Sequence, residues 1–313
     1  MTPAIVVTGA AGLVGQNLVP LLRERGHRVV AFDKNRTNLT ILEQLNPGVA
    51  AEHVDLSRPG PWQERFAGAS AVVDLKAQIT ALEHNTFERH NVEAGRLVLE
   101  ACERHAVPHL VHLSSSVVIS VADDGYTRSK RRGEELVRNG RAPFTVLRPP
   151  LLYGCFDAKH LGWLAGFLRK APIVPIPGSG RYMRQPLYVK DLCGVILSAL
   201  ARGPRNGVHN VIGHERIDFI DILRALAAEL GLRRVLLPIP LPLFRLLLGA
   251  YALVFRKPPF TTEQLDALTA GDDFPVEPWS EEFGVPYTPF HQALREVYAS
   301  PLRRYNDLMA SPH

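Results

Sequence analysis

Short apolar runs alternate with amphipathic stretches through the first half of the chain. The runs have the length of β-strands, and the stretches between them, such as 13–25 and 86–105, repeat apolar residues at helical spacing. Six strands are predicted, at 5–8, 28–32, 50–54, 71–75, 109–113 and 144–147. Strand–helix alternation of this kind forms a parallel sheet with helices on both faces. We therefore predict an α/β fold with a doubly wound parallel sheet, which binds ligands at the carboxyl ends of its strands.

The pattern of apolar runs and amphipathic stretches changes after Pro149 and Pro150. Further prolines and glycines between 172 and 180 indicate loops. Helices return, and we predict them at 190–201, 219–230 and 290–299. We assign residues 1–155 to the sheet domain, with 183–212 returning to it, and residues 156–313 to a smaller, mostly helical cap that binds substrate.

One segment, 235–255, is apolar apart from Arg245. Its 21 residues would just span a bilayer, but prolines at 238, 240 and 242 prevent a continuous helix, so a membrane span is disfavoured. We expect a buried helix of the cap here. A helix over 241–255 that lies on a membrane surface or binds a partner is the less favoured alternative.

Composition excludes several classes of protein. The 313 residues are 46% hydrophobic and 21% charged, values of an ordinary globular chain. Cys102, Cys155 and Cys193 form no CxxC pair, so neither a disulfide framework nor a metal site is predicted. The net charge is +5, but the basic residues are scattered, so no nucleic-acid partner is expected. The amino terminus has no basic region ahead of its apolar run, and we expect a cytoplasmic protein.

Three glycines follow the first predicted strand and open a helix. Gly9, Gly12 and Gly15 would let the backbone N–H groups approach a pyrophosphate at the helix N-terminus. Asp33 ends the second strand, where a carboxylate accepts hydrogen bonds from the adenosine ribose, so NAD is favoured over NADP. Lys34 and Arg36 oppose this preference, since either could reach a phosphate. Asp55 is expected near the adenine; alternatively, it is a cap or loop acid.

Tyr126 and Lys130 lie one helical turn apart. A tyrosine ordinarily ionises near pH 10, and a nearby ammonium stabilises its phenolate. Such a tyrosine can exchange a proton with an alcohol or ketone while hydride moves to or from a nicotinamide. The pair follows a strand that ends in three serines, 114–116, one of which could donate to the developing alkoxide.

These residues together resemble the extended short-chain dehydrogenase/reductase family, the NAD-dependent epimerases and dehydratases of its nucleotide-sugar branch. The similarity covers about residues 4–212. It rests on the glycine motif, Asp33, Asp55-Leu56, Asn91-Val92, Ser114 to Ser116, Tyr126 with Lys130, Leu147-Arg148-Pro149, Tyr153-Gly154, Gly178-Ser179-Gly180, Arg184, Tyr188-Val189 and Asp191-Leu192.

The resemblance implies roles for individual residues and a Rossmann sheet. Ser116 would orient the substrate, Tyr126 would act as acid and base, and Lys130 would hold the cofactor ribose and lower the tyrosine pKa. The implied substrate contacts are Ser115, Tyr153 and Arg184. Cofactor contacts are implied at Gly9, Gly12, Leu13, Val14, Gly15, Asp33, Asp55, Leu56, Leu75, Lys76, Asn91, Tyr126, Lys130 and Pro149. A homodimer is implied through the helices at 86–105 and 126–137.

The function predicted first is an NAD-dependent epimerase or ketoreductase acting on a secondary alcohol or ketone, most readily a nucleotide-linked sugar. One departure weakens the nucleotide-sugar hypothesis. Nucleotide-sugar enzymes bind a phosphate through an arginine just before a Gly-Asp pair, and this chain has Thr269 and Ala270, with no arginine, just before Gly271. The apolar segment at 235–255 supports a second hypothesis, a dehydrogenase of a bulky alcohol such as a steroid or hopanoid. A third hypothesis is a non-catalytic cofactor-holding subunit like the accessory subunit of complex I, which generally lacks the Tyr–Lys pair.

Overall fold

A computed structural model describes residues 3–79, 85–121, 123–254, 265–266, 268–269, 271 and 273–309. Its core is a seven-stranded sheet in the order β11-β6-β5-β4-β1-β2-β3, and every neighbouring pair in it is parallel. The strands are β1 Ala4–Thr8, β2 Arg28–Asp33, β3 Ala50–His53, β4 Ala71–Asp74, β5 Leu110–Leu113, β6 Phe144–Arg148 and β11 Gly207–Asn210. The α/β prediction and all six predicted strands are confirmed. The seventh strand, β11, joins from the segment predicted to return to the sheet.

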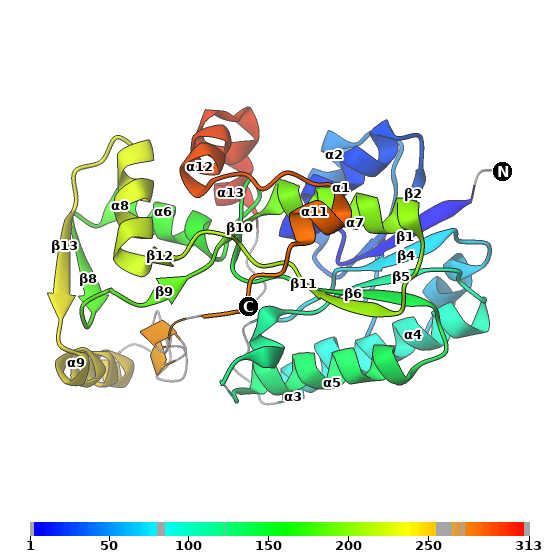
Figure 1. Ribbon diagram of the computed structural model, residues 1–313, viewed down its shortest axis with the longest axis horizontal. Coiled ribbons are helices and arrows are strands. Elements are labelled where there is room, and N and C mark those ends of the chain that lie inside the picture. The colour runs from blue at the N-terminus through cyan, green and yellow to red at the C-terminus, as the bar shows by residue number, and fades with distance from the viewer. Residues whose placement is uncertain are drawn as a thin grey trace.

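Helices cover both faces of this sheet (Figure 1). One face carries α1 Leu13–Glu24, α2 Arg36–Leu45 and α7 Val189–Arg202, and the other carries α4 Ala94–Arg104 and α5 Gly125–Asn139. The alternation along β1 explains the two layers, because Ile5 and Val7 pack under α1 while Val6 packs under α4. Strand order reverses between β1 and β4, the position at which doubly wound sheets bind ligands.

The predicted helix at 86–105 is interrupted. It begins with the short α3, Asn85–Phe87, continues as a π-helical turn, η2 Glu88–Glu93, and becomes α-helical in α4. π-Helical turns inside α-helices are frequent at functional sites. Here the turn carries Asn91, a predicted site residue.

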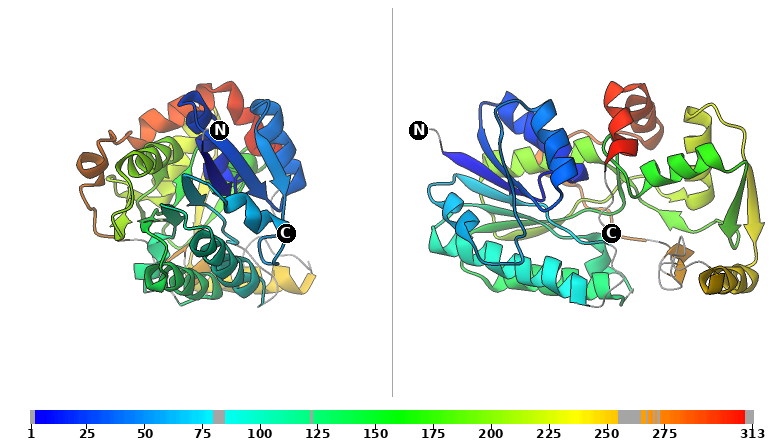
Figure 2. Two further views of the ribbon diagram at one scale, coloured as in Figure 1. Left: turned by 90° about the vertical axis from the view of Figure 1, so that its right-hand side faces the viewer. Right: turned by 180° about the vertical axis from the view of Figure 1, so that it is seen from behind.

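The cap lies beyond the carboxyl ends of the strands, at the side of the molecule away from the N-terminus (Figures 1 and 2). Its helices are α6 Leu161–Lys170, α8 Phe219–Glu229 and α9 Leu241–Val254. Two strand pairs connect it, β8 Ile173–Pro177 with β13 Val235–Ile239, and β9 Met183–Arg184 with β12 Ile217–Asp218. A third pair, β7 Leu152–Tyr153 with β10 Leu187–Tyr188, precedes α7.

The chain after residue 278 returns to the sheet. The helices α11 Trp279–Phe283, α12 Phe290–Ala299 and α13 Tyr305–Leu308 contribute to the same hydrophobic cluster as α1 and α7. The indole nitrogen of Trp279 donates to the Ile212 carbonyl at 2.7 Å, and Ser198 of α7 donates to the Phe283 carbonyl at 2.6 Å. These contacts fix α11 beside α7, while α12 packs against α8 and α13 against α6.

The expectation of a buried helix in the apolar segment is wrong. From Val235 to Tyr251 every residue is exposed or half-buried, and Leu246 is 69% exposed. Val235–Ile239 forms β13, a strand of a two-stranded sheet in which Pro238 is tolerated, and Leu241–Val254 forms α9. In the described part of the chain, no helix is long and apolar enough to cross a membrane.

Candidate active site

Glycines shape the loop between β1 and α1. Gly9 has a φ of +66°, and an added Cβ would lie 2.8 Å from the backbone nitrogen and Cα of Lys76. At Gly15 an added Cβ would lie 2.2 Å from the carbonyl oxygen of Ala10. Gly12 caps α1 without placing a side chain over the helix N-terminus. The loop therefore has the close backbone approach and the positive helix end that bind a phosphate.

A cavity of about 260 Å³ lies at this loop, next to the ends of β2, β4 and β5. Its wall contains most of the residues predicted from the sequence: Gly9, Gly12, Leu13, Val14, Asp33, Asp55, Leu56, Leu75, Lys76, Ser115, Tyr126 and Pro149. The remaining predicted residues do not line it; they are Gly15, Asn91, Ser116, Lys130, Tyr153 and Arg184.

The Asp33 carboxylate holds the turn at the end of β2. It accepts hydrogen bonds from the backbone N–H groups of Ala11 at 2.9 Å and Asn35 at 2.8 Å. Burial raises the pKa of Asp33, while these two hydrogen bonds and the Lys34 ammonium oppose the rise. The Lys34 ammonium donates to the Gln78 side-chain oxygen at 2.9 Å. Asp33 thus lies in the cavity wall, where the sequence predicts an acceptor for ribose hydroxyls.

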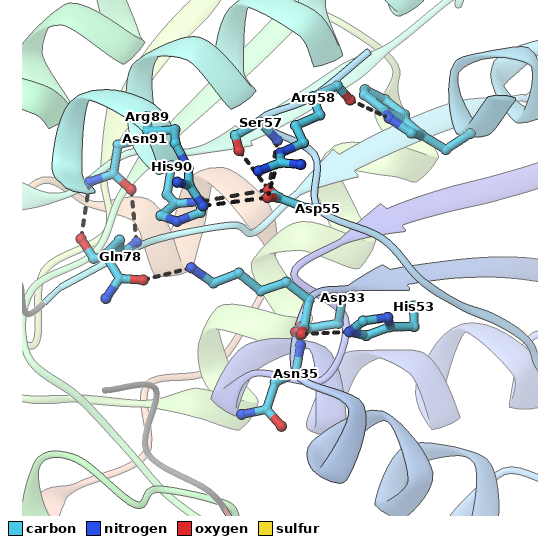
Figure 3. Close-up of polar contacts among 12 residues, drawn as sticks. Asp33, Asn35, His53, Asp55, Ser57, Arg58, Gln78, Arg89, His90 and Asn91 are labelled. Carbon is cyan, nitrogen blue, oxygen red and sulfur yellow. Dashed lines mark hydrogen bonds and ion pairs between the residues drawn. The ribbon is translucent and has the colours of Figure 1, made fainter. Parts of the chain in front are cut away.

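Asp55 has basic neighbours on the opposite wall. Its carboxylate accepts from the Ser57 hydroxyl at 2.6 Å and lies 3.6 Å from Arg89 and 3.8 Å from His90 (Figure 3). Burial raises the pKa of Asp55, but the Ser57 hydrogen bonds and the two basic side chains outweigh it, so the pKa is lowered. Asp55 accepts from the backbone of a local turn and also lines the cavity; its place near the adenine stays a prediction.

Tyr126 lies in the first turn of α5, and the Ser115 hydroxyl is close enough to lower its pKa. Burial raises the pKa of Tyr126 to about 12, and the Ser115 hydrogen bond opposes that rise. The phenol is therefore protonated at neutral pH. A protonated phenol beside a serine hydroxyl is the form that delivers a proton to a ketone oxygen.

Lys130 lies one turn further along α5, behind the cavity wall. Its ammonium donates to the Leu113 carbonyl at 2.8 Å. Burial, and then the neighbouring Lys76 ammonium, lower the pKa of Lys130 to about 8, against the attraction of Asp74 and Glu134. Lys130 is thus buried and charged at neutral pH, and it is fixed to the end of β5.

The three serines after β5 have different surroundings. Ser114 donates to the Glu134 carboxylate at 2.7 Å, and Glu134 in turn pairs with Arg148. Ser116 is 2% exposed, and its backbone N–H donates to the Pro149 carbonyl at 2.9 Å. Ser115 alone of the three both lines the cavity and bonds to Tyr126. The geometry therefore favours Ser115 for the role that the resemblance gives to Ser116.

Asn91 holds the cavity wall from behind. Its amide bonds both backbone groups of Gln78, at 2.8 Å and 3.0 Å, and donates to the Ser129 hydroxyl at 2.9 Å (Figure 3). Ser129 donates to the Tyr126 carbonyl at 2.7 Å. Asn91 therefore joins the chain after β4 to the first turn of α5, and it acts on the site by positioning.

Two residues expected to contact substrate lie elsewhere. Tyr153 is 1% exposed and packs against Tyr188 and Phe290, with ring centroids 5.8 Å and 5.2 Å away. A substrate contact is not compatible with that burial. Arg184 is 7% exposed on β9, and its guanidinium donates to the Leu268 carbonyl.

The structure adds residues to the cavity that sequence reasoning missed. Phe156, Lys159 and His160 reach it from the chain leading into α6, and Met309 reaches it from the end of the described chain. Burial, and then the Lys34 ammonium, lower the pKa of Lys159 to about 8. No spacing motif marks these residues, because they come from segments far from the glycine loop in sequence.

The sheet, the phosphate loop, the acid after β2 and the Tyr–Lys pair define a class of protein, a dinucleotide-dependent oxidoreductase with a Rossmann fold. The profile of the NAD dependent epimerase/dehydratase family matches residues 5–213. The chain belongs to this family, an extended form of short-chain dehydrogenases/reductases, as the sequence predicts. NAD is the cofactor of the family, and the enzyme class is that of epimerases, dehydratases and reductases.

Relatives of this chain include named reductases. The ceramide reductase of Caulobacter vibrioides is 25% identical over 76% of this chain and 74% of that protein. The 2-alkyl-3-oxoalkanoate reductase of Stenotrophomonas maltophilia is 26% identical over 95% of this chain and 98% of that protein. A solved double mutant of DesIV, a dTDP-glucose 4,6-dehydratase of Streptomyces venezuelae with NAD bound, superposes with a TM-score of 0.78 at 18% identity, over 97% of this chain and 99% of that one. This last similarity shows the fold.

Proposed function

We propose that the protein is an NAD-dependent ketoreductase, or the corresponding alcohol dehydrogenase, whose substrate is a bulky apolar molecule. The observation that carries the reaction type is the placement of both Ser115 and Tyr126 in the wall of the cavity. The residues present fit NAD, since the glycine loop offers N–H groups to a pyrophosphate and Asp33 offers acceptors to a ribose. When bound, NAD in its reduced form supplies a hydride.

The chain's own residues would handle the proton. The Tyr126 hydroxyl donates its proton to the carbonyl oxygen of the substrate, and the Ser115 hydroxyl donates a hydrogen bond to the same oxygen. The resemblance gives Lys130, whose ammonium is held on the Leu113 carbonyl, the role of favouring the phenolate that is left after transfer. In the reverse direction the phenolate takes the proton of an alcohol.

The substrate class follows from what surrounds the site. Arg184, the candidate for a diphosphate contact, is nearly buried and bound to a carbonyl of the chain. The residues just before Gly271, Thr269 and Ala270, include no arginine that could take its place. Two relatives over three quarters or more of this chain are named as reductases of ceramide and of a 2-alkyl-3-oxoalkanoate, both with long aliphatic groups. These points favour an apolar ketone over a sugar nucleotide.

A nucleotide-linked sugar is the second candidate substrate. Arg184 occupies the position at which related enzymes contact a diphosphate, and the superposed dehydratase is named for a nucleotide sugar. The planar fork of an arginine guanidinium suits a diphosphate.

One assay separates the candidates. NADH oxidation is followed with a long-chain 2-alkyl-3-oxoalkanoate, with a ceramide-like ketone and with a dTDP-4-keto sugar. We expect turnover of an aliphatic ketone and a loss of ~10²–10⁴-fold in Tyr126→Phe, with NAD binding unchanged. Turnover of the sugar alone would overturn the apolar assignment. NAD binding without turnover of any of the three would favour the non-catalytic subunit hypothesis.

A further inference from the structure

An apolar surface covers the far end of the cap. On α9, Leu243, Leu246, Leu247 and Tyr251 are 47%, 69%, 51% and 41% exposed. Their spacing of three, four and eight residues places them on one stripe of the helix. Globular helices ordinarily turn such a stripe toward the core.

The helix α9 turns its apolar stripe outward, whereas a surface helix of a globular protein turns it toward the core. Its one charged residue, Arg245, is not on the stripe; it pairs with Asp266 of the protein at 2.5 Å. The apolar side chains thus face outward while the charge is neutralised by the chain itself. Burial against the remainder of this described chain does not explain that arrangement.

The strands β13 and β8, next to α9 in the cap, also expose apolar side chains. Val235 and Leu237 alternate along β13 and are 60% and 47% exposed. Ile173 of β8 lies opposite Val235 in the parallel register and is 55% exposed. Figures 1 and 2 show β8, β13 and α9 together at the end of the cap, away from the N-terminus. We call these seven residues the apolar cap surface: Ile173, Val235, Leu237, Leu243, Leu246, Leu247 and Tyr251.

Basic side chains outnumber acidic ones next to this surface. The described residues 230–254 contain no acidic residue and three basic ones, Arg233, Arg234 and Arg245, of which Arg245 is paired with Asp266. Lys170 comes shortly before Ile173, beside Arg169, which is paired with Asp307 at 3.2 Å. Exposed aliphatic side chains flanked by arginine and lysine are the pattern of a segment that binds an anionic lipid surface.

We propose that the apolar cap surface docks onto an anionic lipid surface. A second copy of the chain is a poorer occupant, because a symmetric contact would bring the basic segments of both copies together. The aliphatic stripe would enter the boundary between headgroups and acyl chains, and Arg233 and its basic neighbours would contact the headgroups. Docking of this kind would hold the cap where an apolar substrate is dissolved. The docking itself does not depend on catalysis.

The test is sedimentation of the full chain with lipid vesicles. Vesicles of phosphatidylcholine alone are compared with vesicles in which a third of the lipid is phosphatidylglycerol. We expect the wild type to sediment with the anionic vesicles and to be released by salt. The double variant Leu246→Glu/Leu247→Glu should lose at least about tenfold in partition coefficient, and Arg233→Glu should lose a smaller factor on anionic vesicles only.

Leu302→Glu is the matched control, since Leu302 is a leucine 37% exposed outside the apolar cap surface. It should sediment as the wild type does. Circular dichroism and NAD binding check that each variant is folded. Wild-type protein that stays in the supernatant with both vesicles overturns the proposal, as does undiminished binding by the double variant. A wild-type dimer that the double variant abolishes, without vesicle binding, would assign the surface to a second copy. None of these outcomes involves turnover, so they leave the reductase assignment to its own assay.

Discussion

Asp74 and Lys76 form an ion pair beneath the active site, with Nζ of Lys76 2.7 Å from Oδ2 of Asp74. Their side chains are 2% and 9% exposed. The carboxylate also accepts from the Thr8 hydroxyl at 2.5 Å and contacts Nδ1 of His112 at 2.9 Å. Lys76 lies in the cavity wall, close enough to Lys130 for its ammonium to lower the pKa of that lysine, while Asp74 raises it.

Loss of Lys76 should be costly, because it leaves a buried carboxylate without its ammonium. We expect Lys76→Met to lower the free energy of unfolding by about 3–5 kcal/mol at pH 8. The double variant Asp74→Asn/Lys76→Met should be more stable than Lys76→Met, since it removes the orphaned charge. Urea unfolding of the four proteins of this cycle measures both effects. Strictly additive losses would show that the two groups do not interact.

Substitutions of Ser115 and Ser116 should differ clearly in their effect on turnover. Ser115→Ala removes the hydroxyl bonded to Tyr126 and should lower the turnover number by ~10²-fold or more. Ser116→Ala should leave the turnover number within a few-fold of wild type, because Ser116 lies outside the cavity. Steady-state kinetics of both variants decide the assignment, and a larger loss in Ser116→Ala would reverse it.

Asp33 should set the preference for NAD. Its carboxylate can accept one or two hydrogen bonds from a ribose, each worth ~1.5–3 kcal/mol, and it repels a 2′-phosphate. Asp33→Ala should weaken the binding of NAD and narrow the difference in affinity between NAD and NADP. Asp33→Asn should have an intermediate effect. Calorimetric titration with both cofactors provides the measurement. A wild type that prefers NADP would mean that Lys34 and Lys159 dominate the site.

Lys130 should give the protein a distinct dependence of stability on pH. Because its folded pKa is lowered to about 8 from 10.5, the unfolded chain binds a proton between these values that the folded chain lacks. The contribution of Lys130 to stability therefore rises with pH in this window, by at most about 1.4 kcal/mol per unit. Urea unfolding of wild type and Lys130→Met at several pH values from 7 to 10 measures the difference. Lys159 and Tyr126 are common to both proteins and cancel. A difference that is flat with pH would contradict the lowered pKa.

The sequence predicts the sheet well because hydrophobic alternation and glycine spacing are local. β11 was not predicted as a strand, since its sequence offers one aliphatic side chain, Val208, and its position depends on pairing with β6. The cofactor end of the site is equally predictable from the sequence, since Gly9 and Asp33 lie at the ends of predicted strands.

The remainder of the site depends on tertiary contacts. A run of three serines does not reveal which hydroxyl faces Tyr126, because the short turn after β5 decides it. The apolar segment 235–255 was assigned to the interior on hydropathy alone, and hydropathy does not tell a buried helix from an exposed docking helix. The homodimer, the domain limits and the cytoplasmic location stay predictions.

Met309 has a practical consequence for work with this protein. It lines the cavity and lies 4.0 Å from the Gln16 amide of α1. A group joined to the chain close behind Met309 would therefore start from the cavity wall. Figure 1 shows the N-terminus at the opposite side of the sheet domain from the cap. A purification tag or an immobilisation linker therefore belongs at the N-terminus, where it leaves the cofactor entrance and the cap unobstructed.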